Sequence, residues 1–243
     1  MKGTIWCMHG AVGQAADWQG FAVPGWAVRR VDLWRFVACC PLPIAEFGRA
    51  LNEEARATPG PRVLLGYSMG GRLALHALLE KDSPWDAAVI VSAHPGLESE
   101  EERAARRAAD AEWAARALQM EWSDFLTAWN EQPVFDGEAI SMADRRLLST
   151  RKQEVARSFM DWSLGTQEPL WERLSEIKVP VLWAVGGRDE KFRTLGERAV
   201  SGIPGAKLAV LETAGHRVPW EAAEGFPKLV GDFLTEGTEN YAG

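Results

Sequence analysis

The sequence predicts an α/β fold in which a mostly parallel sheet is flanked by helices and carries a helical cap insertion. Two observations predict it. Short apolar runs alternate with helical stretches in the first part of the chain, as in strands joined by crossover helices. This strand pattern then stops in the middle of the chain and resumes later. The runs are almost continuously apolar, which is typical of parallel strands covered on both faces.

Six runs are expected to form strands. They are Thr4–Met8, Ala27–Leu33, Arg62–Gly66, Ala87–Ser92, Val181–Val185 and Lys207–Leu211. Apolar residues at helical spacing follow the third run, over Met69–Lys81, and recur near the end of the chain, over Glu221–Leu234. The sheet therefore has helices on the connections between its strands.

The segment 97–165 is expected to be an all-helical cap, because it lacks strand-like runs and is rich in Ala, Glu, Arg and Trp. Its acidic stretch Glu98–Glu102 is typical of a helix start, where negative charge interacts favourably with the helix dipole. Breaks are expected at Asn130–Val134 and at Phe135–Gly137. Residues 1–96 and 166–243 then form one core domain.

The chain has 243 residues and a formal net charge of −7, which disfavours nucleic-acid binding because that needs a basic surface. No uncharged apolar run approaches the ~18 residues that span a bilayer, and no signal-peptide pattern is present. The three cysteines lack the spacing of metal ligands. We expect a cytoplasmic protein, monomeric or weakly homo-oligomeric, that uses no metal, cofactor, nucleic acid or membrane.

The clearest chemical motif is Gly66–Gly71, which reads Gly-Tyr-Ser-Met-Gly-Gly between an expected strand and an expected helix. This fits the G-x-S-x-G turn that exposes a nucleophilic serine above a sheet. A chance glycine turn is the alternative, and the flanking elements argue against it. The motif therefore predicts the α/β-hydrolase fold with Ser68 as its central residue.

A serine hydroxyl needs a histidine to remove its proton, and the histidine needs a carboxylate to orient it. His216 follows the last expected strand, and Asp189 follows the one before. The chain order Ser, Asp, His is the one this fold uses. Taken alone, His216 would be interpreted as a structural histidine and Asp189 as a surface aspartate. Together with Ser68 they predict a Ser68–His216–Asp189 triad.

An oxyanion hole needs two backbone N–H groups, for which Met69 and Ala11 are the candidates. His9, just before, is expected to be structural. Arg72 lies one helical turn after Ser68, either beneath the pocket or bent toward solvent. Most cap arginines are expected on solvated faces, and Trp129 either walls the pocket or joins the cap to the core.

Several segments together resemble one family, the 2-succinyl-6-hydroxy-2,4-cyclohexadiene-1-carboxylate synthases of menaquinone biosynthesis, which are α/β-hydrolase-fold lyases. Gly-Gly-Arg after the serine, His-Pro-Gly-Leu and Gln-Pro-Val-Phe are narrower signals than the serine turn, and the resemblance covers nearly the whole chain. The segments are His9–Trp18, Gly66–Arg72, His94–Leu97, Arg103–Ala114, Trp129–Phe135, Gly187–Phe192 and Ala214–His216.

The resemblance implies elimination of pyruvate from 2-succinyl-5-enolpyruvyl-6-hydroxy-3-cyclohexene-1-carboxylate, with Ser68 as the base. It also implies that three arginines hold substrate carboxylates: Arg72, Arg106 and Arg151. Tyr67 and Trp129 complete the expected substrate contacts. The chain departs from the family at Trp34-Arg35, at Asn130 and at Arg217.

Two other functions are the alternatives to this lyase. A serine carboxylic ester hydrolase would use the same residues on a neutral acyl group, for which an apolar pocket is expected instead of Arg72. A binding protein without catalysis would not need a complete triad. An anionic small-molecule substrate remains the partner that the arginines favour, because an acidic protein must gather cations locally to bind it.

Overall fold

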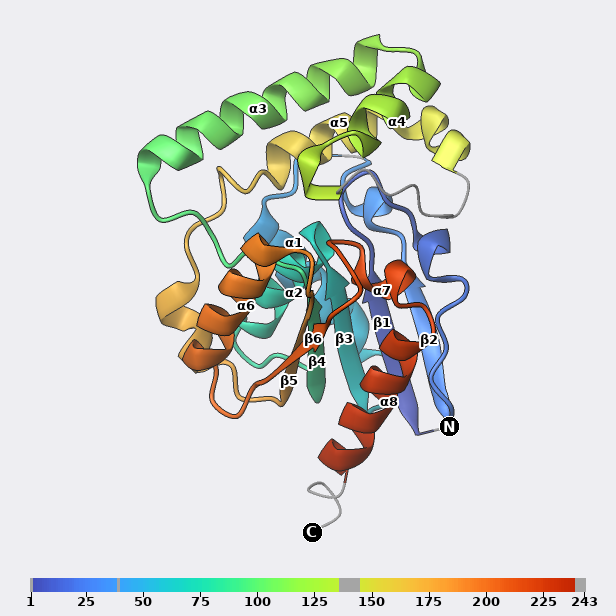
Figure 1. The fold of residues 1–243 in the computed structure, drawn as a ribbon, viewed down its shortest axis with the longest axis vertical. Helices are drawn as coiled ribbons and strands as arrows, with labels where there is room; N and C mark the ends of the chain where they lie inside the picture. The colour runs from blue at the N-terminus through green and yellow to red at the C-terminus, as the bar shows by residue number, and fades with distance from the viewer. Residues whose placement is uncertain (1, 39, 136–144, 239–243) are drawn as a thin grey trace.

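The computed structural model describes residues 2–38, 40–135 and 145–238, and its centre is a parallel sheet (Figure 1). The strand order is β2-β1-β3-β4-β5-β6. All six expected strands are present, with ends shifted by one or two residues. They are β1 (Gly3–Met8), β2 (Trp26–Val31), β3 (Arg62–Tyr67), β4 (Ala87–Val91), β5 (Val181–Gly186) and β6 (Lys207–Leu211).

Helices lie between these strands along the chain, and two more follow the last strand. They are α1 (Ile44–Arg56), α2 (Met69–Leu78), α3 (Glu100–Gln119), α4 (Trp122–Asn130), α5 (Lys152–Asp161), α6 (Glu190–Gly202), α7 (Val218–Glu221) and α8 (Gly225–Thr238). In the part of the chain that the structure describes, no helix is long and apolar enough to cross a membrane.

Alternate strand residues build two separate cores, one on each face of the sheet. Trp6, Leu64 and Trp183 belong to the core that also contains apolar residues of α1, α2 and α6. Ile5, Leu65 and other strand neighbours belong to the second core, with α8. Because successive side chains of a strand point to opposite faces, a run buried on both faces is apolar throughout.

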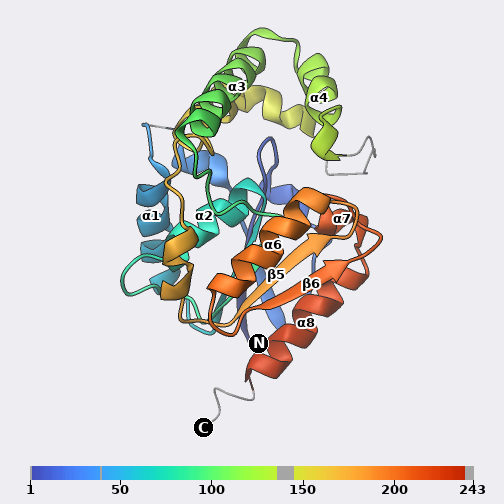
Figure 2. The ribbon, with the colours of Figure 1, turned by 60° about the vertical axis from the view of Figure 1, so that its left-hand side comes forward.

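The middle segment forms the cap, with α3, α4 and α5 over one end of the sheet (Figures 1 and 2). Strand β1 begins and helix α8 ends toward the opposite end of the sheet, so the cap faces the carboxyl ends of the parallel strands. A break follows α4, where a short 3-10 helix covers Pro133–Phe135. The rest of the expected break at Phe135–Gly137 lies outside the described residues.

The closing helix expected over Glu221–Leu234 is present as α8, but it begins four residues later than expected, at Gly225, and continues to Thr238. Glu221 instead ends the short helix α7, and Ala222 after it has non-helical dihedral angles, φ −116° and ψ 49°. The Glu221 carboxylate accepts hydrogen bonds from the backbone N–H groups of Gly215 and Arg217. The chain is therefore held against the preceding loop at this point and starts a new helix afterward. Similarly, α2 ends at Leu78, three residues before the expected end at Lys81.

The strand order also locates the site. From β1 the chain first builds outward to β2 and then returns to the other side with β3. In open parallel sheets, ligands bind outside the carboxyl ends of the strands at such a reversal. The loops that follow β1 and β3 meet there, and they are the two loops predicted to carry the oxyanion hole and the serine.

Candidate active site

Ser68 lies on the sharp turn between β3 and α2, with φ 52° and ψ −112°. The turn leaves no room for a side chain on either flanking residue, Gly66 or Gly70, and glycine fits there because it has none. A Cβ on Gly66 would lie 2.4 Å from the Gly70 carbonyl oxygen, and one on Gly70 would lie 2.6 Å from that of His9. The positive φ of a non-glycine residue is strained backbone of the kind found at active sites. The motif thus forms the turn predicted for it.

The structure brings Ser68, His216 and Asp189 together from three different strand ends. The Nδ1–H group of His216 donates to Asp189 Oδ2 at 2.7 Å. This leaves Nε2 free to accept a hydrogen bond from the Ser68 hydroxyl, 3.2 Å away. Asp189 also caps α6, since its Oδ1 accepts the Phe192 N–H at 3.2 Å. The arrangement suits proton removal from the serine by an oriented imidazole.

Aromatic rings hold the His216 imidazole in place. Phe192 and Tyr67 pack against it, with ring centroids 4.4 Å and 5.5 Å away. The ring centroid of Phe135, in the cap, lies 6.0 Å from that of His216. The imidazole is almost completely buried, so its orientation is fixed by packing as well as by Asp189.

The loop of residues 9–14, called the oxyanion loop below, makes a tight turn after β1. The Gly13 N–H donates to the Gly10 carbonyl at 3.1 Å. Trp34 donates its indole N–H to the Gly13 carbonyl at 2.9 Å, so this departure from the family supports the loop. His9 is fully buried and donates from Nδ1 to Gly10, and burial lowers its pKa to about 3. A neutral, enclosed His9 fits the structural role predicted for it.

A cavity of about 300 Å³ opens beside Ser68, between the core and the cap. Eight of the predicted site residues line it: Ala11, Tyr67, Ser68, Met69, Arg72, Arg106, Trp129 and His216. Asp189 lies behind His216. The cavity therefore collects both candidate oxyanion residues, the serine and two of the three predicted arginines.

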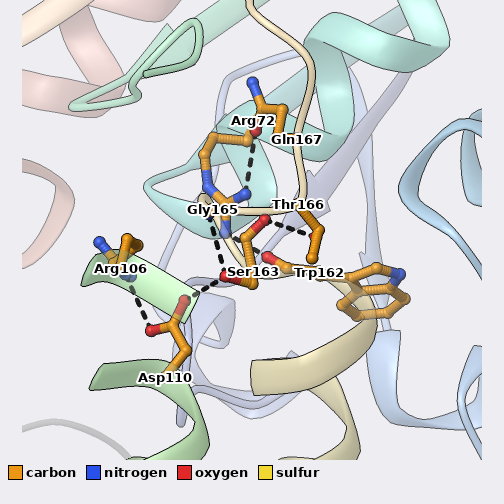
Figure 3. A network of polar contacts seen from close by, with 8 residues as sticks. All are labelled: Arg72, Arg106, Asp110, Trp162, Ser163, Gly165, Thr166 and Gln167. Carbon is orange, nitrogen blue, oxygen red and sulfur yellow. Dashed lines mark hydrogen bonds and ion pairs between the residues drawn. The ribbon is translucent and has the colours of Figure 1, made fainter. Parts of the chain in front are cut away.

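Arg72 is the most buried of the cations that line this cavity, and Figure 3 shows its contacts. Its guanidinium donates to Gln167 Oε1 at 3.0 Å and to the Trp162 carbonyl at 2.7 Å. Both acceptors are neutral, although a buried cation is usually stabilised by an anionic partner. Burial, and then the nearby charge of Arg106, lower the pKa of Arg72, while Asp110 opposes the shift. Because both hydrogen-bond partners of Arg72 are neutral, its positive charge remains available to an anion in the cavity.

Arg106 reaches the cavity from α3, and a buried carboxylate orients it. Its Nε–H donates to Asp110 Oδ1 at 2.9 Å, and Asp110 Oδ2 accepts the Ser163 hydroxyl at 2.7 Å (Figure 3). The Gly165 N–H donates to that hydroxyl in turn at 2.9 Å. Because Asp110 has both oxygens engaged, Arg106 is fixed in position with its Nη groups free of this contact.

The structure does not bring Arg151 to the cavity. Arg151 ends the 3-10 helix Arg145–Arg151 of the cap and pairs with Asp32 at 3.3 Å. Sequence reasoning missed Lys191, His94 and Gln132, which line the cavity instead. All three fall within segments that carry the family resemblance, so position in a motif was the available signal.

Two departures from the family contact each other. Arg217, next to His216, donates to the Asn130 side chain at the end of α4. Its guanidinium carbon also lies 3.8 Å from the centre of the Phe135 ring, a cation–π contact. Burial lowers the pKa of Arg217. This group of three residues, called the cap clasp below, links the histidine loop to the cap.

Comparison with known proteins agrees with this geometry. A Bacillus subtilis (strain 168) protein provisionally named 2-succinyl-6-hydroxy-2,4-cyclohexadiene-1-carboxylate synthase is 34% identical over 178 residues, which are 71% of this chain and 65% of that protein. The chain thus spans slightly less than two thirds of that relative. A synthase of the same name from Salmonella paratyphi C (strain RKS4594) is 28% identical over 90% of this chain and 88% of its own length.

Among solved structures, MenH from S. aureus superposes with a TM-score of 0.83 at 23% identity, covering 98% of this chain and 95% of that one. At this identity the likeness concerns the fold. The alpha/beta hydrolase family matches residues 8–227, nine tenths of the chain. The chain belongs to the alpha/beta hydrolase family.

Proposed function

We propose that the protein is a lyase that eliminates pyruvate from 2-succinyl-5-enolpyruvyl-6-hydroxy-3-cyclohexene-1-carboxylate, giving 2-succinyl-6-hydroxy-2,4-cyclohexadiene-1-carboxylate. The observation that carries this proposal is the pair of arginines, Arg72 and Arg106, in the cavity beside Ser68. The proposed substrate has three carboxylates, and guanidinium groups are well suited to bind them. The names of the two curated relatives support the same reaction.

The first step uses the triad as a base. His216, oriented by Asp189, takes the Ser68 proton, and the resulting alkoxide removes the ring C2 proton, which lies α to the succinyl carbonyl. Negative charge develops on the carbonyl oxygen as the C2–H bond breaks. In this proposal the backbone N–H groups of Ala11 and Met69, two residues that line the cavity, stabilise that charge.

The elimination then moves electrons around the ring. The C2 electron pair forms the C2–C3 double bond, the C3–C4 double bond shifts to C4–C5, and the C5–O bond breaks. Enolpyruvate leaves with that bond pair and takes up the proton that His216 took from Ser68, which gives pyruvate and restores neutral His216 and the Ser68 hydroxyl. No electrons are gained or lost overall, so these steps need no redox partner and no covalent acyl-enzyme.

Tyr67 and Trp129 complete the cavity wall around the ring. Burial raises the pKa of the Tyr67 phenol, which therefore stays neutral beside His216. Trp129 is buried under the cap and presents an aromatic surface. We propose that the cap, residues 97–165, serves to cover the substrate and exclude water from it.

A serine carboxylic ester hydrolase is the second candidate, because the Ser68–His216–Asp189 geometry and the oxyanion loop suffice for acyl transfer. The elimination has a direct test. Pyruvate release from the enolpyruvyl substrate is followed with a coupled reductase, with Ser68→Ala as the blank. We expect the wild-type protein to release pyruvate well above the spontaneous rate. Ser68→Ala should not exceed that rate. Ester cleavage without pyruvate release would instead assign the protein to the hydrolases.

A further inference from the structure

Lys191 is a cation whose position is not explained by folding. It lies in the first turn of α6, after Glu190 and after Asp189, which is the N-cap residue of this helix. A positive charge at a helix N-terminus interacts unfavourably with the helix dipole. Among the described residues, none forms an ion pair with Lys191, and it lines the cavity beside Ser68. Its side chain is exposed, so it stands toward the open side of the cavity, whereas Arg72 is buried.

His94 adds a neutral donor on the same cavity wall. The Gly96 N–H donates to His94 Nδ1 at 3.0 Å, so the neutral ring carries its proton on Nε2. Burial lowers the pKa of His94 to about 4, and the charges of Lys191, Arg72 and Arg106 act in the same direction. No carbonyl or side chain of the described residues accepts a hydrogen bond from that Nε2–H group. His94 therefore offers a donor without adding a charge.

The cavity holds as many cations as the proposed substrate has carboxylates. Arg72, Arg106 and Lys191 line it, while Arg151 is paired with Asp32 outside it. The one carboxylate among the lining residues, Asp110, already holds Arg106 and Ser163. A third carboxylate of the substrate thus has Lys191 as its available cation.

The position of Lys191 also indicates which carboxylate this is. Pyruvate is the smaller of the two products, and a site for its carboxylate at the exposed Lys191 would let it leave while the ring stays beside the buried Arg72. From this we infer that Lys191, with the Nε2–H of His94, binds the carboxylate of the pyruvate leaving group, in the place that the resemblance gave to Arg151. This inference rests on the proposed function for the identity of the ligand.

The test uses Lys191→Gln, with Lys191→Arg as the conservative variant. Lys178→Gln is the matched control, because Lys178 is an exposed lysine that donates to the Ser175 carbonyl before β5 begins, at the opposite end of that strand. Pyruvate binding to each full-length protein is measured by ligand-observed NMR titration. We expect about tenfold weaker binding for Lys191→Gln, near wild-type binding for Lys178→Gln, and recovery in Lys191→Arg.

Steady-state kinetics give the second readout. The carboxylate keeps its charge throughout the reaction, so its contact is equally strong in the ground and transition states. Lys191→Gln should therefore raise the KM for the enolpyruvyl substrate about tenfold and leave kcat nearly unchanged. A kcat loss at unchanged KM would overturn the inference.

The two proposals fail separately. Pyruvate binding that is absent from the wild-type protein, or equal in wild type and Lys191→Gln, overturns the subsite even if the protein releases pyruvate. Failure of the wild-type protein to release pyruvate overturns the lyase, while Lys191-dependent pyruvate binding in the same preparation would still support the subsite.

Discussion

At the residue scale, Trp34 connects the second strand with the oxyanion loop. Its indole N–H donates to the Gly13 carbonyl at 2.9 Å, and its ring packs on His9 with centroids 4.9 Å apart. The side chain is buried, so the loop conformation depends on a contact from a distant part of the sequence.

Trp34→Phe is expected to destabilise the fold by about 1 kcal/mol, since one buried hydrogen bond is lost. It should also lower kcat more than it raises KM, because a less fixed oxyanion loop stabilises the transition state less. Trp85→Phe is the control, as it loses a comparable bond to Asn52, 2.7 Å long, outside the cavity. Equal kcat losses in the two variants would contradict this role for Trp34.

The three triad residues could be predicted from the residues alone because their positions follow from strand ends. Ser68, Asp189 and His216 each come directly after an apolar run, and parallel strands bring their carboxyl ends to one edge. No strand end fixes the position of Arg151, because it lies in the cap, where the sequence does not show which helix face points inward. Lys191 and His94 follow strands β5 and β4, but their side chains alone do not reveal a cavity.

At the element scale, the cap is attached to the core by specific polar contacts. Arg145 pairs with the buried Asp17 of the loop after β1 at 2.9 Å. The cap clasp joins Arg217 of the histidine loop to Asn130 and Phe135. Since Arg217 follows His216 directly, the cap position and the histidine position are linked through neighbouring residues.

A double-mutant cycle tests the cap clasp. Asn130→Ala removes the acceptor, and Arg217→Met removes the donor while keeping most of the side-chain stem. We expect a coupling free energy of unfolding of about 0.5–3 kcal/mol, the range for residues in direct contact. Urea denaturation of the two single variants and the double variant gives this value. Additive effects, within about 0.5 kcal/mol, would show that the contact is not formed in solution.

The elements were predicted best where burial dictates the pattern. Strands buried on both faces gave apolar runs that mark their positions closely. The start of the closing helix was mispredicted because the amphipathic spacing continues across residues 222–224. In the structure, hydrogen bonds from the Gly215 and Arg217 N–H groups to Glu221 hold the chain just before these residues, and the helix begins after them. A single sequence shows the spacing but not the carboxylate that turns back to the preceding loop.

At the scale of the whole molecule, two buried histidines and one half-buried histidine link stability to pH. Burial lowers the pKa of His9 to about 3, and those of His76 and His94 to about 4. The unfolded chain therefore takes up protons below about pH 6.5 that the folded chain does not. The free energy of unfolding should fall as the pH drops from 6.5 toward 4, by up to roughly 1.4 kcal/mol per pH unit for each histidine.

His76→Gln tests this dependence away from the cavity, because His76 lies in α2 and none of the described residues forms a hydrogen bond with its Nε2. Urea denaturation at pH 7, 6 and 5 should show a shallower loss of stability in the variant than in the wild type. Burial raises the pKa of Asp17, which acts in the opposite sense in both proteins and so cancels in the comparison. Identical slopes would contradict the assigned cause.

The whole molecule is acidic, yet its cavity gathers cations at the reversal point of the sheet. This contrast is the main physical argument for an anionic substrate, since a neutral ester gains little from buried guanidinium groups. The triad is common to both candidate reactions, so the charge of the cavity is what distinguishes them.

The most direct test of this account measures Arg72→Met on two substrates with one preparation. The variant keeps the apolar stem and removes the charge, and turnover of a neutral p-nitrophenyl ester reports whether the triad is still assembled. The account predicts that kcat/KM for the enolpyruvyl substrate falls about a hundredfold or more, as for a lost charged hydrogen bond, while ester turnover stays within about threefold. Equal losses on both substrates would show that Arg72 serves the fold, and would contradict a cavity built for an anion.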